Sequence, residues 1–146
     1  MPPRSGWEGS IGAFAVAEPQ KPLPVKMFCG LICAEGVDVE EVLGELVALF
    51  GGVEDRFGPH RFDTYTRYYG RQMGAPLWRH FFSFEPLADP DFLVEAKIRA
   101  NLLERRWMGS HSRRVNLDPG YIHPARLVLA SCKDFAHRIY LGRGIY

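Results

Sequence analysis

The stretch VKMFCGLICA, residues 25–34, is a continuous apolar run that decides how the rest of the chain is interpreted. A run of this length, bounded by Pro24 and by Glu35-Gly36, is typical of a strand that is buried on both faces of a sheet. We therefore expect the ordered domain to begin near Val25. The segments that follow must supply the rest of the sheet and its cover.

Two amphipathic helices are predicted after this strand. Apolar residues recur at helical spacing over residues 38–50, where Asp38 can cap the first turn and Gly51-Gly52 ends the helix. The second helix is predicted over residues 90–107, with Asp89 as its N-cap. Its apolar stripe consists of Phe92, Ala96, Ala100, Leu103 and Trp107.

Further strands are predicted on either side of the second helix. Residues 77–85 and 112–118 have strand character, and we expect them to pair in antiparallel fashion with residues 25–34. Residues 136–146 are predicted to form another strand, whereas residues 124–134 fit either helix or strand. This order of elements predicts an α+β, ferredoxin-like sandwich: an antiparallel sheet with two main helices on one face, plus an appended C-terminal strand or hairpin. Residues 53–70 are interpreted as an irregular extended segment that turns at Gly58-Pro59.

The length and composition fit one ordinary globular domain. The chain has 146 residues, and five of its eleven prolines lie in residues 1–24, which we interpret as a flexible tail before a single domain over residues 25–146. The net charge of +1 supplies no bulk basic field for nucleic acid or a membrane surface. Since no apolar run reaches membrane-spanning length, we expect a cytoplasmic protein.

The cysteine and histidine patterns favour neither a disulfide framework nor a metal site. The three cysteines are few and odd in number, and Cys29 and Cys33 would lie about 13 Å apart along one face of a strand. We interpret them as buried apolar side chains. The five histidines are scattered without a metal-binding motif, so we predict no metal ligands and name no cofactor.

Two boxes near the C-terminus carry a family resemblance. They are NLDPGY, residues 116–121, and KDFAHRIYLGRGIY, residues 133–146. Together with PVKMFCGL (24–31) and the segment 62–87, they make the chain resemble the bacterial domain of unknown function family 4416. The resemblance implies no activity, substrate or catalytic residue. It also implies a further strand and an aromatic-rich tail after Tyr146, so we expect the chain to be a fragment. Some members are labelled GTP-binding, but this sequence has no G-x-x-x-x-G-K-[ST] loop.

Polar side chains gather in three places that could form a site. Lys97, Asn101 and Glu104 share one face of the second helix, beside its apolar stripe, and a solvated helix face is the alternative. Asp118 precedes a Pro-Gly turn that could aim its carboxylate into a crevice, although turn chemistry alone explains such a sequence. The third place is the cluster of Lys133, Asp134, His137 and Arg138, for which a charged loop is the alternative.

We hypothesise that these places form one polar pocket at an end of the sheet, which binds a small anionic ligand such as a nucleotide or phosphate ester. We expect Arg138, Tyr140 and Asp118 on its inner side, an Arg138–Asp118 ion pair, and Lys133 reaching in from a turn. The predicted ligand-binding residues are Asp118, Tyr121, Lys133, His137, Arg138, Tyr140, Lys97 and Asn101.

The sequence leaves other functions open. Whether the domain is an enzyme is undecided, and Asp118 with His137 is the pair we would test for acid–base chemistry. A protein–protein interaction module, in which the polar residues only brace the fold, is the alternative function. It would bind a protein partner or form a homodimer through an exposed edge strand. Arginine and tyrosine interleave over residues 61–71, but we interpret that segment as packing and expect no nucleic-acid partner.

Overall fold

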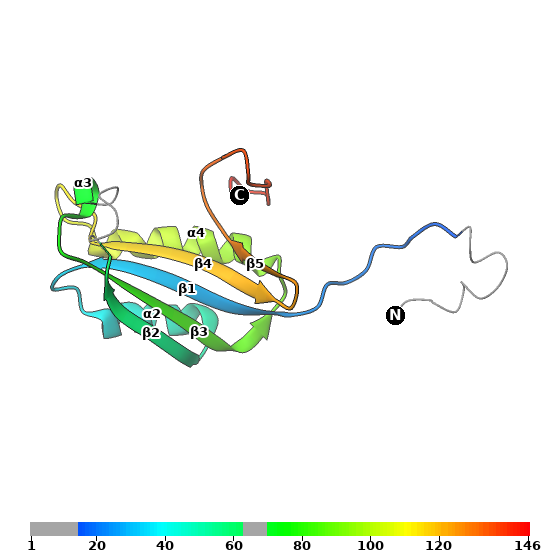
Figure 1. The fold of residues 1–146 in the computed structure, drawn as a ribbon, viewed down its shortest axis with the longest axis horizontal. Helices are drawn as coiled ribbons and strands as arrows, with labels where there is room; N and C mark the ends of the chain where they lie inside the picture. Colours follow the sequence, from blue (N-terminus) through cyan, green and yellow to red (C-terminus); the bar gives the residue numbers. More distant parts are fainter. Residues whose placement is uncertain (1–14, 63–69) are drawn as a thin grey trace.

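Five antiparallel strands form one sheet in the part of the chain that the computed structural model describes, residues 15–62 and 70–146 (Figure 1). The order across the sheet is β2-β3-β1-β4-β5. The strands are β1 (Val25–Ala34), β2 (Val53–Arg61), β3 (Leu77–Ala88), β4 (Val115–His123) and β5 (Arg126–Leu129). The helices are α2 (Val39–Phe50), α3 (Gly70–Met73) and α4 (Phe92–Glu104), and a 3-10 turn, η2 (Arg105–Trp107), follows α4.

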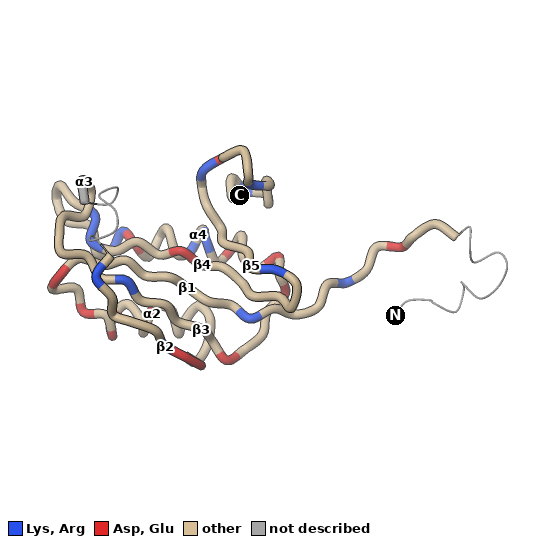
Figure 2. Tube along the Cα trace, viewed as in Figure 1, with Lys and Arg blue, Asp and Glu red and all other residues tan. Residues whose placement is uncertain are grey.

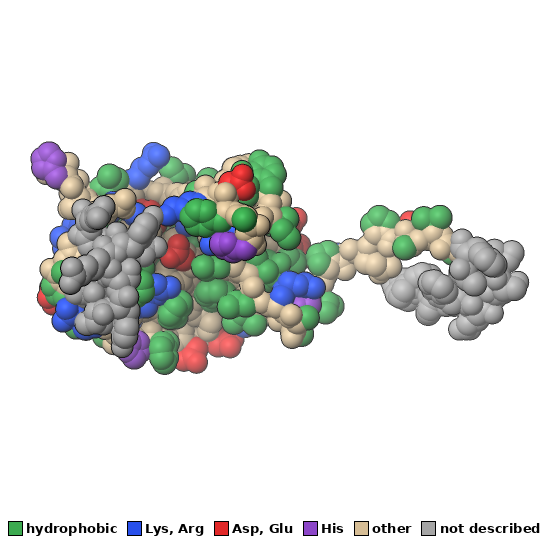
Figure 3. Space-filling model, turned by 45° about the horizontal axis from the view of Figure 1, so that its top comes forward, with side chains coloured by type: hydrophobic (Ala, Val, Ile, Leu, Met, Phe, Trp, Pro, Cys, Tyr) green, Lys and Arg blue, Asp and Glu red, His purple; other side chains and the backbone are tan. Residues whose placement is uncertain are grey.

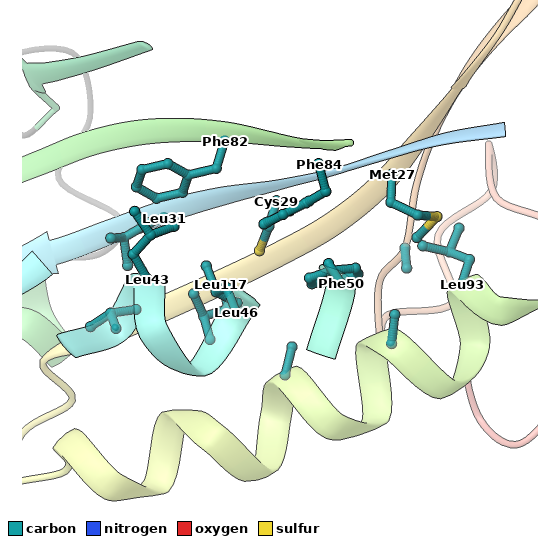
Figure 4. Packing of buried hydrophobic residues seen from close by; sticks show 14 of the residues in the cluster. Met27, Cys29, Leu31, Leu43, Leu46, Phe50, Phe82, Phe84, Leu93 and Leu117 are labelled. Carbon is teal, nitrogen blue, oxygen red and sulfur yellow. The ribbon is translucent and has the colours of Figure 1, made fainter. Parts of the chain in front are cut away.

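The predicted α+β class is confirmed, with β1 in the middle of the sheet. Leu31 of β1 lies opposite His80 of β3 on one side and Leu117 of β4 on the other. The sheet differs from a standard four-stranded ferredoxin sheet because β5 adds a fifth strand beside β4. Both long helices lie on the same face of the sheet, where their apolar side chains meet those of β1, β3 and β4 (Figure 4).

The two helices begin and end for different local reasons. Asp38 accepts hydrogen bonds from the backbone N–H groups of Glu40 and Glu41, and α2 ends at Gly51, whose φ of 96° favours glycine. Helix α4 begins later than predicted, because its N-cap is Asp91 and not Asp89. Its last predicted turn, residues 105–107, tightens into η2.

Strand β4 passes through Asp118-Pro119-Gly120, where the sequence predicted that the strand would stop. Pro119 lies opposite Cys29, and its ring nitrogen points away from β1, so the missing N–H costs the sheet no hydrogen bond. The carbonyl of Pro119 accepts a hydrogen bond from Ala130 N. Gly120 lies beneath the ring of Phe28, where a Cβ atom would stand 2.5 Å from Phe28 Cζ. The proline and the glycine are therefore compatible with this strand for reasons of tertiary contact.

Two other predicted elements are wrong. Residues 53–61 form a strand, β2, which pairs with β3 through two register shifts. Residues 136–146 form no strand; they make turns and an isolated bridge between Gly142 and Ile145. Glycines with positive φ at positions 142 and 144 explain why this segment folds back on itself instead of extending. The ambiguous segment 124–134 contains β5.

The described part of the tail lies away from the sheet. Residues 15–24 are exposed throughout and extend from the start of β1 (Figure 1). Residues 1–14 and 63–69 lie outside the described residues, so the tail is only partly observed and most of the arginine–tyrosine segment is not. No helix in the described ranges is long and apolar enough to cross a membrane.

Candidate functional site

The edge of β4 next to α4 is where the polar side chains meet. Over residues 115–118 no described strand pairs with this edge, because β5 pairs with residues 120–123. Two side chains of α4 take the place of the missing strand. Glu104 Oε2 accepts a hydrogen bond from Leu117 N at 2.7 Å, and Lys97 Nζ donates to Leu117 O at 3.1 Å. Both polar groups of Leu117 are thus satisfied by a helix and not by a strand.

A connected set of ion pairs and hydrogen bonds extends from these two side chains. Lys97 Nζ lies 3.5 Å from Asp118 Oδ1, and Asp118 Oδ2 accepts from Asn116 Nδ2 at 2.9 Å. Arg113 Nη2 donates to Asn116 Oδ1 at 2.6 Å and to Glu104 Oε1 at 3.2 Å. Lys97 is only 6% exposed, so its charge is stabilised chiefly by these oxygen atoms.

These groups form one wall of a cavity of about 390 Å³, which we call the polar cleft. The opposite wall is the segment after β5, residues 129–138. Figure 2 shows acidic and basic residues interleaved where β4 runs beside α4. The cleft is lined by Gln72, Lys97, Asn101, Glu104, Arg113, Asn116, Asp118, Leu129, Ala130, Ser131, Cys132, Lys133, Phe135 and Arg138.

The electrostatics of the cleft favour an anion. Four basic side chains, Lys97, Arg113, Lys133 and Arg138, line it against the two carboxylates Glu104 and Asp118. Burial raises the pKa of the Glu104 carboxyl above its ordinary value, and the hydrogen bond from Leu117 and the nearby Lys97 and Arg113 only partly oppose this. Burial therefore opposes the charged form of Glu104.

The structure brings together five of the eight predicted ligand-binding residues. Lys97 and Asn101 of α4, Asp118 of β4, and Lys133 and Arg138 of the last segment all line the polar cleft. Glu104, which was predicted to share a helix face with the first two, lines it as well. The helical spacing of Lys97, Asn101 and Glu104 was the sequence signal that predicted the part of the cleft wall supplied by α4.

The other three predicted residues do not line the cleft. Tyr121 packs against the main core, on the other part of β4. His137 is exposed and lies against the ring of Phe135, so Asp118 and His137 do not line one cavity as an acid–base pair would. Tyr140 is exposed, and its hydroxyl accepts a hydrogen bond from Gly144 N. Tyr140 was misplaced because residues 136–146 were expected to alternate as a strand, with Tyr140 on the same side as Arg138.

The predicted ion pair between Arg138 and Asp118 does not form. Arg138 Nη1 donates to Leu129 O at 3.2 Å, and Asp118 pairs with Lys97 instead. The cleft also lies along an edge of the sheet and not at its end. Sequence reasoning missed Arg113 and Asn116, although the alternation of Asn116 with Val115 and Leu117 placed its polar side chain on the non-core side of β4.

The side chains that line the cleft determine which chemical groups it could hold. Basic side chains can bind phosphate or carboxylate oxygens, while Asn101 and Asp118 can orient a hydroxyl group. Cys132 Sγ accepts a hydrogen bond from Asn101 Nδ2 at 3.2 Å. Within residues 15–62 and 70–146, no three His, Cys, Asp or Glu side chains come together as they would around a metal ion.

The fold and the cleft together define an α+β domain with a polar site on the edge of an antiparallel sheet. The family model described as a domain of unknown function, DUF4416, matches residues 23–146, and the chain belongs to that family. No curated protein and no solved structure matches the chain.

Proposed function

We propose that the domain binds a small anionic ligand, a nucleotide or another phosphate ester, in the polar cleft. The observation that carries the proposal is the charge balance of the cleft, in which four basic side chains line one cavity with two carboxylates. A cavity of about 390 Å³ lies within the usual size of small-molecule sites.

Arg138 is the side chain that we propose as the ligand's main partner, and Lys133 lines the same wall. Lys97 and Arg113 are held by carboxylates and amide oxygens of the opposite wall. Arg138 donates through Nη1 to a backbone carbonyl, and its buried Nε has no hydrogen-bond partner among the described residues. A phosphate that bridges Arg138 and Lys133 would add charge-assisted hydrogen bonds at this wall.

The proposal is tested by thermal denaturation with inorganic phosphate, pyrophosphate and a set of nucleotides as probes. A probe at 100 times its Kd raises the free energy of unfolding by about 2.7 kcal/mol. We expect Arg138→Ala to remain folded and to lose that increase. Arg126→Ala is the matched control, because Arg126 lies on β5 and does not line the cleft. An equal loss in both variants, or no stabilisation by any probe, would count against the proposal.

A second function is supported by the network beneath the cleft. The hydrogen bonds from Lys97 and to Glu104 replace a strand along β4, as expected if these residues brace an interaction module. Bracing and binding make different predictions for Arg138, which lies on the far wall. If only bracing holds, Arg138→Ala changes no ligand response because there is none to change.

For the fold, we propose that the domain is a ferredoxin-like sandwich to which β5 has been added. Support comes from the chain order β1-α2-β2-β3-α4-β4 and from the two helices on one face of the sheet. An experimental structure would test this assignment. We expect the first four strands to keep the order β2-β3-β1-β4 in it.

A further inference from the structure

On the face of the sheet opposite the two long helices, Ile32, Ala34, Met73 and Leu77 form a small buried cluster at one end, and beyond it apolar side chains of the described residues are exposed. Phe28, Phe57, Phe81, Ile122 and Leu127 line a shallow hollow of about 330 Å³ on this face, and we call these five residues the open-face patch. Phe57 is 62% exposed and Leu127 is 68% exposed. Figure 3 shows hydrophobic side chains next to one another over the strands. Contiguous apolar side chains of this kind mark an interaction surface.

Two glycines place the aromatic rings of the patch close against the sheet. Phe81 lies over Gly30, where a Cβ atom would stand 3.1 Å from the Phe81 ring. Phe28 lies over Gly120, where a Cβ atom would approach the Phe28 ring to 2.5 Å. The rings therefore cover the strands in the manner of a smooth apolar layer, which suits contact with another flat surface.

The charges around the patch are arranged in a self-complementary way. Phe57 of β2 pairs with Phe81 of β3. Along the direction of the strands, Asp55 lies on one side of this pair and Arg79 lies on the other side. Both charged side chains are on the open face, since Asp55 lines the hollow and Arg79 lies over the Phe81 ring at 4.6 Å. A two-fold axis in the plane of contact, perpendicular to the strands, would bring Asp55 of one copy toward Arg79 of its partner.

Other occupants fit this face less well. A single-stranded nucleic acid could stack on Phe28 and Phe81, but it requires an excess of basic side chains, and Arg79 is balanced here by Asp55. The edges of the sheet are also poor docking sites. Strand β2 carries two register shifts and Pro59, and the edge of β4 is occupied by Lys97 and Glu104.

We propose that the open-face patch packs against the same patch of a second copy, which gives a symmetric dimer with four layers, helices, sheet, sheet and helices. The four longer strands, β1 to β4, at about 4.8 Å spacing and about 30 Å length present roughly 600 Å² in projection. This matches the ~600 Å² per partner at the lower end of specific interfaces. The proposal does not depend on a ligand in the polar cleft.

Sedimentation velocity of the full chain tests the dimer between about 1 μM and about 200 μM, a range that covers moderate affinities. We expect the mass to rise from 16.6 kDa toward twice that value. Phe57→Lys and Leu127→Lys should each weaken the dimer at least about tenfold, because each puts an unpaired charge into the apolar contact. Leu102→Lys is the matched control, because Leu102 is exposed on α4, on the opposite side of the sheet.

A charge exchange tests the orientation of the two copies. Asp55→Arg alone should weaken the dimer because it places like charges together, and adding Arg79→Asp should restore it in part. A chain that stays monomeric throughout the range overturns the proposal, as does a dimer that Leu102→Lys disrupts and Phe57→Lys does not. Binding of labelled oligouridine that is lost in Phe57→Lys, in a monomeric chain, would assign the face to nucleic acid instead.

Discussion

The two faces of the sheet are built from the same kinds of residue, yet among the described residues the two long helices pack on only one of them. On the helix face, Phe84, Leu31 and Leu117 are completely buried beneath α2 and α4. On the open face, Phe57 and Leu127 expose most of their side chains. The strands thus supply two apolar surfaces. Helices α2 and α4 cover one, while on the other the described residues bury the small cluster of Ile32, Ala34, Met73 and Leu77. The comparison teaches that an apolar residue in this domain stabilises the monomer on one face and is free to stabilise an association on the other.

The largest expected difference between the faces lies in the free energy of unfolding. Phe84→Ala removes a ring that stacks on Phe50 at 4.6 Å, and it should lower that free energy by about 3–5 kcal/mol. Phe57→Ala should lower it by less than about 0.5 kcal/mol in dilute, monomeric protein. Urea denaturation of both variants measures the difference. Equal losses would show that the open face is part of the folding core.

The polar edge of β4 allows a second comparison, between the charge of Glu104 and its hydrogen bond. Glu104→Leu leaves Leu117 N without a partner and should cost about 1–3 kcal/mol. Glu104→Gln keeps an acceptor oxygen and should cost much less. Because burial raises the pKa of Glu104, the folded state loses stability as the pH rises from the ordinary value of 4.5 through the raised pKa. Glu104→Gln should remove that loss, as followed by urea denaturation across acidic pH.

The glycine beneath the open face can be compared with a glycine on the helix layer. Gly120→Ala should lower the free energy of unfolding by about 1–3 kcal/mol, because its Cβ would meet both Phe28 and the carbonyl of Val128 at 2.5 Å. Gly44→Ala is the matched control, since Gly44 lies in the exposed interior of α2 with open space around it. That variant should gain about 0.5–1 kcal/mol. Thermal denaturation shows whether each substitution lowers or raises the free energy of unfolding.

The smallest expected effect concerns His80, a buried histidine on the helix face. Burial lowers its pKa below 6.5, and the nearby Arg56 lowers it further, so protonation is disfavoured in the folded state. The free energy of unfolding should therefore fall as the pH drops below the ordinary histidine value toward the lowered pKa. His80→Phe should flatten this decline between about pH 5 and pH 8. Urea midpoints across that range give the measurement.

Local patterns in the sequence located the central strand, both long helices and part of the polar cleft. Helical spacing placed Lys97, Asn101 and Glu104 on one face of α4, and the structure places all three in the cleft. These elements were predictable because periodic burial acts within a short segment. The last segment was not, because glycines at positions 142 and 144 allow turns that the alternation of its side chains does not reveal.

The sequence by itself determined the α+β class, the family, and which residues are apolar enough to be buried. Only the tertiary structure decided that β4 continues through Pro119 and Gly120, because this depends on which side of the strand is unpaired and on the ring of Phe28 above it. It also decided that Asp118 pairs with Lys97 and not with Arg138. Both outcomes depend on contacts between residues far apart in the chain, and such contacts leave no local pattern to read.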